Sequence, residues 1–337
     1  MSAVTVANVG ARTAVGLNAR QTGFLLRAGF PAMAEAPLAD AAGEAITMAF
    51  VPTLDGRLVG AERLAALARA PLEEAVAPIR DVPAEVHVAV DEGCSEGPLA
   101  IALLEALVKR VMPAARVTVQ ARGEAGPGAF LPPAIRALET RRANAVVIGG
   151  VHSDYSPHSI TALEASGRLF SRDNLDARIP GEAAAFFVLM RTADVARLKL
   201  APLAHVIGVG TGRERARLDN DEPAYEALGL TAAVRQATEP LMADGRTAGW
   251  ILTDLTGEMR RQCEWQSVFV RAQKVLGRPY LIESPAQRIG YLGAAATPLF
   301  VAMTATAWKH GYAPSPIALT MAGNDGGDRV AVVLGKH

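Results

Sequence analysis

Apolar runs rich in β-branched residues alternate along this chain with alanine-rich segments whose apolar positions follow a helical period. The predicted strands are residues 4–9, 86–90, 117–119, 145–148, 184–190, 205–209, 250–253, 317–321 and 329–334. The predicted helices are residues 19–28, 61–76, 99–111, 133–142, 225–243, 263–276 and 293–309. Strands that alternate with helices predict an α/β fold with mixed, largely buried sheets.

The order of the predicted elements repeats roughly along the chain. Each half contains a strand, a long helix, a strand with a polar loop, another helix and a closing pair of strands. The seam falls near residues 192–201, and no long low-complexity linker separates the halves. We therefore predict an N-terminal half over residues 1–195 and a C-terminal half over residues 196–337, packed as one body.

One segment, residues 289–308, carries no charged side chain over a length that would span a bilayer. It is rich in alanine and contains glycine, threonine and proline, whereas membrane insertion needs strongly apolar side chains at the helix centre. We predict a helix that is buried on all sides in a protein core.

The composition narrows the class of protein. The chain has 337 residues, of which 50% are hydrophobic and 20% are charged, as in a folded globular protein. Lys+Arg and Asp+Glu number 34 each, so no basic excess predicts binding to nucleic acid or to an anionic membrane. Two cysteines, Cys94 and Cys263, are too few for a disulfide framework and indicate a reducing, cytoplasmic setting.

Motifs for a cofactor or a metal are weak. Residues 208–212 read GVGTG, but neither the further glycine nor the lysine of a phosphate loop follows. Asp254, Glu258 and Glu264 lie near a predicted helix start, where acids are common, and no histidine accompanies them. We predict neither a bound cofactor nor a bound metal.

Several segments together carry a family pattern. Residues 144–151 read NAVVIGGV, and residues 170–189 read FSRDNLDARIPGEAAAFFVL, centred on Pro-Gly-Glu at 180–182. Residues 293–314 combine an alanine-rich helix with a His-Gly-x-x-Pro turn, and residues 323–327 form a glycine-rich loop before the last strand.

These segments, with residues 4–30 and 61–76, resemble the β-ketoacyl synthase branch of the thiolase superfamily over nearly the full length of the chain. The resemblance implies a thiolase-like fold, in which two similar halves stack as a five-layered αβαβα sandwich. It also implies a homodimer that pairs through a central strand, and an acyl thioester or an acyl carrier protein as the ancestral partner.

The catalytic positions depart from this family. Its nucleophile is a cysteine at the N-terminus of a buried helix, and the resemblance places Glu124 there. Its two histidines correspond to Leu255 and to Tyr291, or to Gly290 if the gap moves by one residue. Prolines after Glu124 predict that the buried helix begins only near Leu131. The candidate binding residues near these positions are Asp254, Thr256, Gly323, Gly326 and Gly327.

The loss of all three catalytic side chains favours a non-catalytic binding or scaffold subunit. Such a subunit would pair with itself, with an active ketosynthase in polyketide or fatty-acid synthesis, or with an accessory or effector protein. Degenerate chains of this kind also resemble accessory proteins encoded near type VI secretion effectors. The alternative is an acyl-transferring or decarboxylating enzyme with a rebuilt site that uses Glu124, Asp254 or Tyr291.

A serine hydrolase is the remaining alternative. Residues 93–97 read GCSEG and fit a nucleophile elbow with Ser95 as the nucleophile, for which His205 or His310 would be the base. The same glycines also suit a simple strand-to-helix turn in which Ser95 or Cys94 caps the helix.

Overall fold

The structure is a computed structural model that describes residues 4–94, 96–218, 220, 225–277, 279 and 281–337. Ten of the described strands form one continuous sheet, in the order β10-β9-β11-β12-β8-β1-β7-β6-β4-β5. The strands of its first half are β1 (Val4–Thr13), β7 (Glu182–Arg191), β6 (Ala145–Ser153), β4 (Ala84–Val90) and β5 (Arg116–Ala121). Those of its second half are β8 (Ala204–Arg213), β12 (Asp328–Lys336), β11 (Ile317–Gly323), β9 (Trp250–Thr253) and β10 (Leu281–Glu283).

The two halves of the sheet have the same order and the same strand directions. In the first half β1, β7 and β6 are antiparallel, and β6, β4 and β5 are parallel. In the second half β8, β12 and β11 are antiparallel, and β11, β9 and β10 are parallel. The halves join where β1 pairs with β8, with Thr5 opposite His205 and Val6 opposite Ala204. The proposed boundary between residues 195 and 196 stays a prediction, and it falls inside α7 (Thr192–Arg197).

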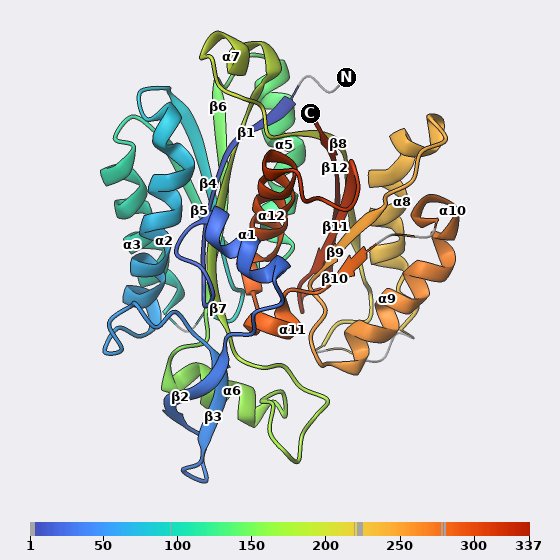
Figure 1. The fold of residues 1–337 in the computed structure, drawn as a ribbon. Helices are drawn as coiled ribbons and strands as arrows, with labels where there is room; N and C mark the ends of the chain where they lie inside the picture. The colour runs from blue at the N-terminus through green and yellow to red at the C-terminus, as the bar shows by residue number, and fades with distance from the viewer. Residues whose placement is uncertain (1–3, 95, 219, 221–224, 278, 280) are drawn as a thin grey trace.

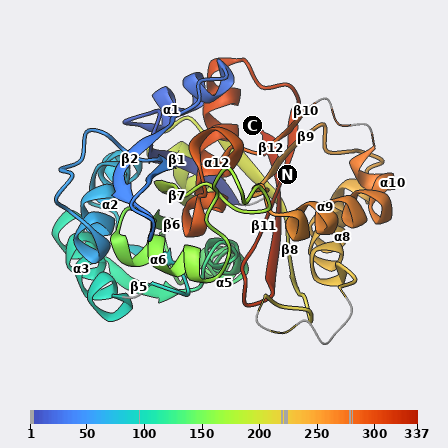
Figure 2. The same ribbon diagram turned by 90° about the horizontal axis from the view of Figure 1, so that it is seen from below.

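Helices form three layers around the two halves of the sheet (Figures 1 and 2). The outer face of the first half is covered by α2 (Gly60–Val76) and α3 (Gly97–Val111), and that of the second by α8 (Leu228–Ala243) and α9 (Met259–Arg271). Between the halves lie α5 (Leu131–Glu139) and α12 (Ala296–His310). This arrangement is the five-layered αβαβα sandwich that the resemblance implies.

The remaining elements are α1 (Ala19–Arg27), β2 (Met33–Ala39), β3 (Ala45–Ala49), α4 (Gly126–Ala129), α6 (Pro157–Ala165), α10 (Gln273–Leu276) and α11 (Ala286–Ile289), with 3-10 turns at Ala77–Ile79 and Gly293–Ala295.

Glycines in the first strand of each half let an outer helix approach the sheet closely. A Cβ atom on Gly10 of β1 would lie 2.0 Å from the carbonyl oxygen of Pro71 in α2. A Cβ atom on Gly210 of β8 would lie 1.9 Å from the carbonyl oxygen of Ala233 in α8. Any side chain there would push the helix away, so the glycine-rich run at residues 208–212 serves helix packing within a strand.

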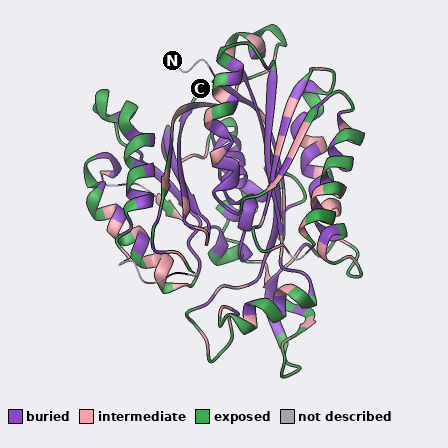
Figure 3. Cartoon of the chain, turned by 180° about the vertical axis from the view of Figure 1, so that it is seen from behind, coloured by how far each residue is buried: buried purple, intermediate pink, exposed green. Residues whose placement is uncertain are grey.

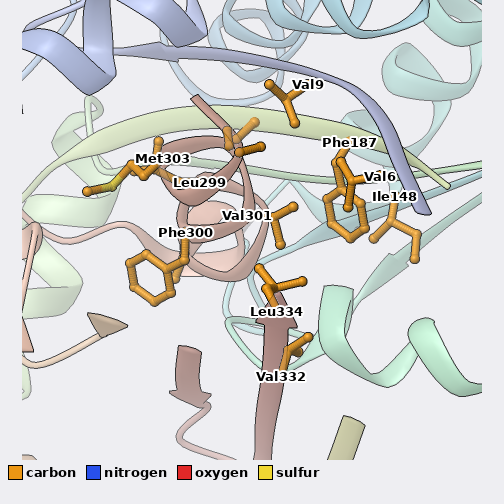
Figure 4. Close-up of a cluster of buried hydrophobic side chains, with 14 of the residues drawn as sticks. Val6, Val9, Ile148, Phe187, Leu299, Phe300, Val301, Met303, Val332 and Leu334 are labelled. Carbon is orange, nitrogen blue, oxygen red and sulfur yellow. The ribbon is translucent and has the colours of Figure 1, made fainter. Parts of the chain in front are cut away.

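The helix α12 is the centre of the molecule, and every residue from Ala296 to Trp308 is buried. Figure 3 shows the burial of each residue: the strands and the middle layer are buried, whereas the outer helices each expose one face. The alanine-rich segment is therefore a core helix, as predicted. Among the described residues, no helix combines the length and the apolar character that crossing a bilayer requires. Figure 4 shows side chains of α12 packed against those of strands from both halves: Val6, Val9, Ile148, Phe187, Leu299, Phe300, Val301, Met303, Val332 and Leu334.

Several element boundaries differ from the sequence-based expectations. The helix expected over 225–243 begins at Leu228, because Ala227 has a left-handed backbone with φ of 55°. The helix expected over 263–276 begins at Met259 and is interrupted at Ala272, after which α10 follows. The small sheet of β2 and β3 was not expected, because its strands are rich in alanine, which is typical of helices.

The carboxylate of Glu182, the first residue of β7, accepts hydrogen bonds from three other parts of the chain. Arg63 of α2 donates to it from Nε at 2.6 Å and from Nη2 at 2.7 Å. Ser153 Oγ donates at 2.7 Å and the backbone N–H of Val51 at 2.5 Å. The side chains of Arg63 and Glu182 are 1% and 0% exposed, and the guanidinium lies 3.6 Å from the ring centroid of Tyr155. This buried ion pair ties the outer helix to the sheet.

We predict that Arg63→Ala destabilises the fold strongly, because it leaves the Glu182 carboxylate buried without its counterion. Breaking such a pair costs about 3–5 kcal/mol in the free energy of unfolding. Urea unfolding followed by circular dichroism measures the loss. Arg69→Ala is the matched control in the same helix, because its ion pair with Glu73 is exposed and should change stability by less than about 1 kcal/mol. Equal losses in the two variants would contradict the prediction.

Candidate functional site

A cavity of about 350 Å³ lies beside the carboxyl ends of β4 and β6. Its wall comes from the loop after β4, the end of β6, α6, the segment before β7, and the loop between β11 and β12. The carboxyl ends of neighbouring parallel strands meet at one edge of a sheet, which is where α/β folds commonly place ligand sites. Much of the wall is polar, with carboxyl, guanidinium and hydroxyl groups.

Glu124 and Tyr291 meet in the wall of this cavity. Glu124 lies between β5 and α4 and is 6% exposed, and the hydroxyl of Tyr291 donates a hydrogen bond to its Oε1. Burial and the charges of Asp325 and Asp91 raise the pKa of Glu124 to about 8, although the hydrogen bond from Tyr291 opposes this shift. The Glu124 carboxyl is therefore mostly protonated at neutral pH.

A short helix that was not expected lies between Glu124 and the helix α5, which begins at Leu131. The short helix α4 starts at Gly126, with Pro127 in its first turn, where the missing N–H has no helical acceptor in any case. Only Phe130 separates α4 from α5, and its N–H bonds to the carbonyl oxygen of Gly126. The longer helix α5 begins at Leu131, as expected, and the separate turn α4 starts two residues after Glu124.

Of the two neighbouring residues Gly290 and Tyr291, it is Tyr291 that lines the cavity beside Glu124. Gly290 has φ of 67°, and its backbone packs on Pro180. The ring of Tyr291 lies edge-on to the His152 ring, with centroids 4.8 Å apart, and the guanidinium of Arg178 lies 3.7 Å from its centroid. Burial, followed by the charge of Glu124, raises the pKa of Tyr291 well above its usual value, so its hydroxyl remains a donor.

His152, at the end of β6, lies between two carboxylates. Its Nδ1 is paired with Asp91, which follows β4, and its Nε2 lies 3.1 Å from Oδ2 of Asp154. Although burial alone would lower it, these two carboxylates raise the pKa of His152 to about 10. The imidazole is therefore a cation at neutral pH, and Asp91 also accepts a hydrogen bond from the backbone N–H of Ala294 at 2.9 Å.

Comparison with known proteins rests on structure, since no protein-family model and no curated protein matches the chain. Three solved structures superpose on almost all of it. The ketosynthase from module 6 of the bacillaene synthase from Bacillus subtilis 168 has a TM-score of 0.77 at 14% identity, covering 99% of this chain and 72% of that one. The ishigamide ketosynthase/chain length factor has a TM-score of 0.84 at 16% identity, and the match covers 100% of this chain and 99% of that one. The third structure is AntDE:AntF, a type II polyketide synthase acyl carrier protein in complex with its ketosynthase bound to the hexaketide. It has a TM-score of 0.82 at 14% identity, and the match covers 100% of this chain and 99% of that one.

The chain has the thiolase-like fold of ketosynthases. Identities of 14–16% establish this fold alone, and the roles of individual residues are argued from the geometry of this chain.

The residues that the resemblance places at catalytic positions divide into two groups, those that line the cavity and those that do not. Glu124 and Tyr291 are in contact at the cavity. Leu255 is buried at 6% exposure in the loop after β9 and does not line that cavity. Asp254 is in an ion pair with Arg261 at 2.5 Å and accepts a hydrogen bond from the N–H of Gly323 at 2.8 Å.

The other predicted binding residues belong to the loops that support the cavity. Thr256 donates a hydrogen bond to Glu258 at 3.0 Å. The N–H of Gly326 donates to Glu92 at 3.2 Å, which docks the glycine-rich loop onto the segment after β4. Gly327 has φ of 98°, in the region that favours glycine. None of these three residues lines the cavity, whereas Asp325, from the same glycine-rich loop, does.

The acids considered for a metal site are held by arginines instead. Glu264 pairs with Arg261 and with Arg329, and Glu258 pairs with Arg168 at 2.6 Å. In the part of the chain that the structure describes, no group of three or more metal-ligating side chains is found.

The residues considered for a serine hydrolase are only partly described. Ser95 lies outside the described residues, and so does its relation to a base. His205 stacks on His337, and His310 lies beside Phe24 at the end of α12; neither histidine lines the cavity. Cys94 does not cap α3, since its N-cap residue is Glu96 and makes no side-chain capping bond.

Sequence reasoning missed His152, Arg178 and Cys94, which all lie at this site. His152 stands directly after the Gly-Gly-Val that ends the strand motif, and Asp91 directly follows β4. Because β4 and β6 are parallel neighbours, with Ala89 opposite Gly150, these two residues are brought together at the sheet edge. The signal was therefore present, but using it requires the strand order.

We predict that Glu124→Gln removes a pH dependence of stability. The folded-state pKa of Glu124, about 8, lies above its ordinary value of 4.5, so the folded protein retains a proton that the unfolded chain releases. Wild-type stability should therefore fall as the pH rises from about 4.5 to about 8, by up to roughly 1.4 kcal/mol per pH unit, relative to the variant. Urea unfolding at several pH values in this window measures the difference. Glu105→Gln, on the exposed face of α3, is the control, and parallel curves for wild type and Glu124→Gln would contradict the prediction.

Proposed function

We propose that this chain is a binding subunit with the ketosynthase fold that forms no acyl-enzyme. One observation carries the proposal. Glu124, which the resemblance places at the nucleophile position, has a buried carboxyl that is protonated at neutral pH and hydrogen-bonded to Tyr291.

Condensing chemistry requires a thiolate nucleophile and donors for the thioester carbonyl. A protonated carboxyl is a poor nucleophile, and Leu255 offers no donor at the position of the first family histidine. Cys94 lines the same cavity, but burial raises the pKa of its thiol, which disfavours the reactive thiolate. These three properties support binding without covalent catalysis.

The free edge of β5 supports pairing with a second chain. β5 is the last strand of the sheet and pairs with β4 along one side. An exposed edge presents N–H and C=O groups that another strand can satisfy. The similar structures include a ketosynthase with a chain length factor and a ketosynthase with an acyl carrier protein. We propose that β5 pairs with a second ketosynthase-fold chain, a copy of this one or an active homologue, and that an acyl carrier protein is a further partner.

A rebuilt enzyme is the second candidate, and one observation favours it. Glu124 and Tyr291 are in contact at the cavity, and His152 packs against Tyr291. All three have shifted pKa values, a combination that is common in active sites. A protonated Glu124 would then act as a general acid toward a thioester carbonyl, and turnover would leave no covalent adduct.

We predict that the intact mass stays unchanged after incubation with acetyl-CoA or malonyl-CoA, because no thiolate faces the cavity. Mass spectrometry of the full chain measures this, and chromatography of the thioesters measures turnover. Cys94→Ser and Glu124→Gln locate any adduct, and Cys263→Ser controls for labelling of the exposed cysteine. A stable adduct that only Cys94→Ser or Glu124→Gln abolishes would overturn the proposal. Turnover without an adduct would replace it by the rebuilt enzyme.

We predict that the chain associates through β5. Sedimentation equilibrium should give a mass of about twice 35.3 kDa for the chain alone, or for its complex with an active ketosynthase of similar size. A single species of 35.3 kDa at all concentrations, with and without such a homologue, would contradict the pairing.

A further inference from the structure

The charged groups along the cavity wall are nearly all paired within the described residues. Asp91 and Asp154 form ion pairs with His152, and Asp325 and Glu258 form ion pairs with Arg168. Glu92 accepts hydrogen bonds from Asn324 and from the N–H of Gly326. Glu96 accepts from the N–H of Ala61, and Glu124 accepts from Tyr291. A ligand that enters the cavity therefore meets few groups that lack a partner.

Arg178 is the exception. No hydrogen bond or ion pair links its guanidinium to another described residue, and its Nε is buried without a partner. The guanidinium lines the cavity and is stacked on the ring of Tyr291, which fixes its plane. Although burial alone would lower it, Tyr291 and Asp154 raise the pKa of Arg178, so the group stays charged. Arg178 is half-buried, and a partly desolvated cation with unused N–H donors is costly unless an acceptor satisfies it.

Glu124 provides a second donor in the same wall. Tyr291 donates to its Oε1, which leaves Oε2 to carry the proton of the neutral carboxyl. Arg178 lies over the Tyr291 ring and Glu124 lies at its hydroxyl, and both line the cavity. An O–H donor and a guanidinium fork that both adjoin this ring are complementary to a carboxylate, whose two oxygens accept from both.

We propose that this cavity binds a small carboxylic acid as its carboxylate, held by the guanidinium of Arg178 and by the protonated carboxyl of Glu124. The cavity of about 350 Å³ is near the lower limit for small-molecule sites, so the acid is short. The inference rests on the proposed function in taking the chain as a binding subunit, and it names the class of ligand.

According to the proposal, the affinity for a carboxylate falls as the pH rises. The ligand requires the neutral form of Glu124, which is lost as the pH rises through about 8. Above that pH the affinity for a carboxylate should fall about tenfold per pH unit, because two adjacent carboxylates repel each other. The titratable and charged groups that interact with Glu124 from the elements packed around it are Asp91, Arg261, Tyr291 and Asp325, and Tyr291 is itself in contact with Arg178 and His152.

Isothermal titration calorimetry of the full chain tests the proposal, with malonate and butyrate as probes and malonamide and butyramide as their neutral counterparts. We expect both acids to bind at pH 7, the amides to bind at least tenfold more weakly, and Arg178→Gln to lose at least tenfold in affinity for the acids. Arg178→Lys keeps the charge but not the planar fork and should also bind weakly. Arg172→Gln, at an exposed arginine that does not line the cavity, should bind like wild type.

Glu124→Gln supplies a test that does not depend on the folding of the arginine variants. Its amide still donates but does not titrate, so its affinity for malonate should be the same at pH 7 and pH 9, while that of wild type falls. Equal binding of acids and amides, no binding of either acid, or an unchanged affinity in a folded Arg178→Gln variant would overturn the inference. These outcomes are separate from the thioester experiment, in which an acyl adduct would remove the proposed function whether or not carboxylates bind.

Discussion

The buried ion pair between Arg63 and Glu182 is the constraint on which the site depends. It fixes the start of β7, so the residues immediately before β7 have little freedom. In that segment the N–H of Gly181 donates to Asp154 at 3.2 Å, and the carbonyl of Ile179 accepts from the N–H of Tyr291 at 2.9 Å. Asp154 in turn holds His152, and Tyr291 holds Glu124. One desolvated contact between an outer helix and a central strand therefore determines where the polar groups of the cavity lie.

The buried charges of the site have different functions because their environments differ. His152 is enclosed by two carboxylates, which hold its charge constant over the physiological pH range. Among the described residues no cation forms an ion pair with Glu124, and burial therefore keeps it neutral until about pH 8. The histidine, usually the group that responds to pH in proteins, is here a fixed structural cation, and the glutamate is the group that titrates.

Much of the fold was predictable because it depends on patterns that are local in sequence. Apolar β-branched runs identified most strands, and the uncharged alanine-rich segment identified the core helix α12. The resemblance also drew attention to Glu124 and Tyr291, which are in contact. Arg178 and His152 were missed because their importance arises from contacts between strands that are distant in sequence. Leu255 and the glycine-rich loop lie in loops near the cavity, but which of their neighbours face it depends on packing that no local pattern encodes.

The position of β1 has a consequence for how the chain acquires its structure. β1 precedes every other described strand along the chain, yet its ladder is completed only by β7 and by the start of β8, at residues 182–205. During translation this apolar strand must therefore remain without its neighbours until residue 205 has left the ribosome. Contacts between residues so far apart in sequence slow folding and prolong the exposure of strand edges. Placing this strand at the centre of the sheet thus makes completion of the sheet wait for a segment far along the chain.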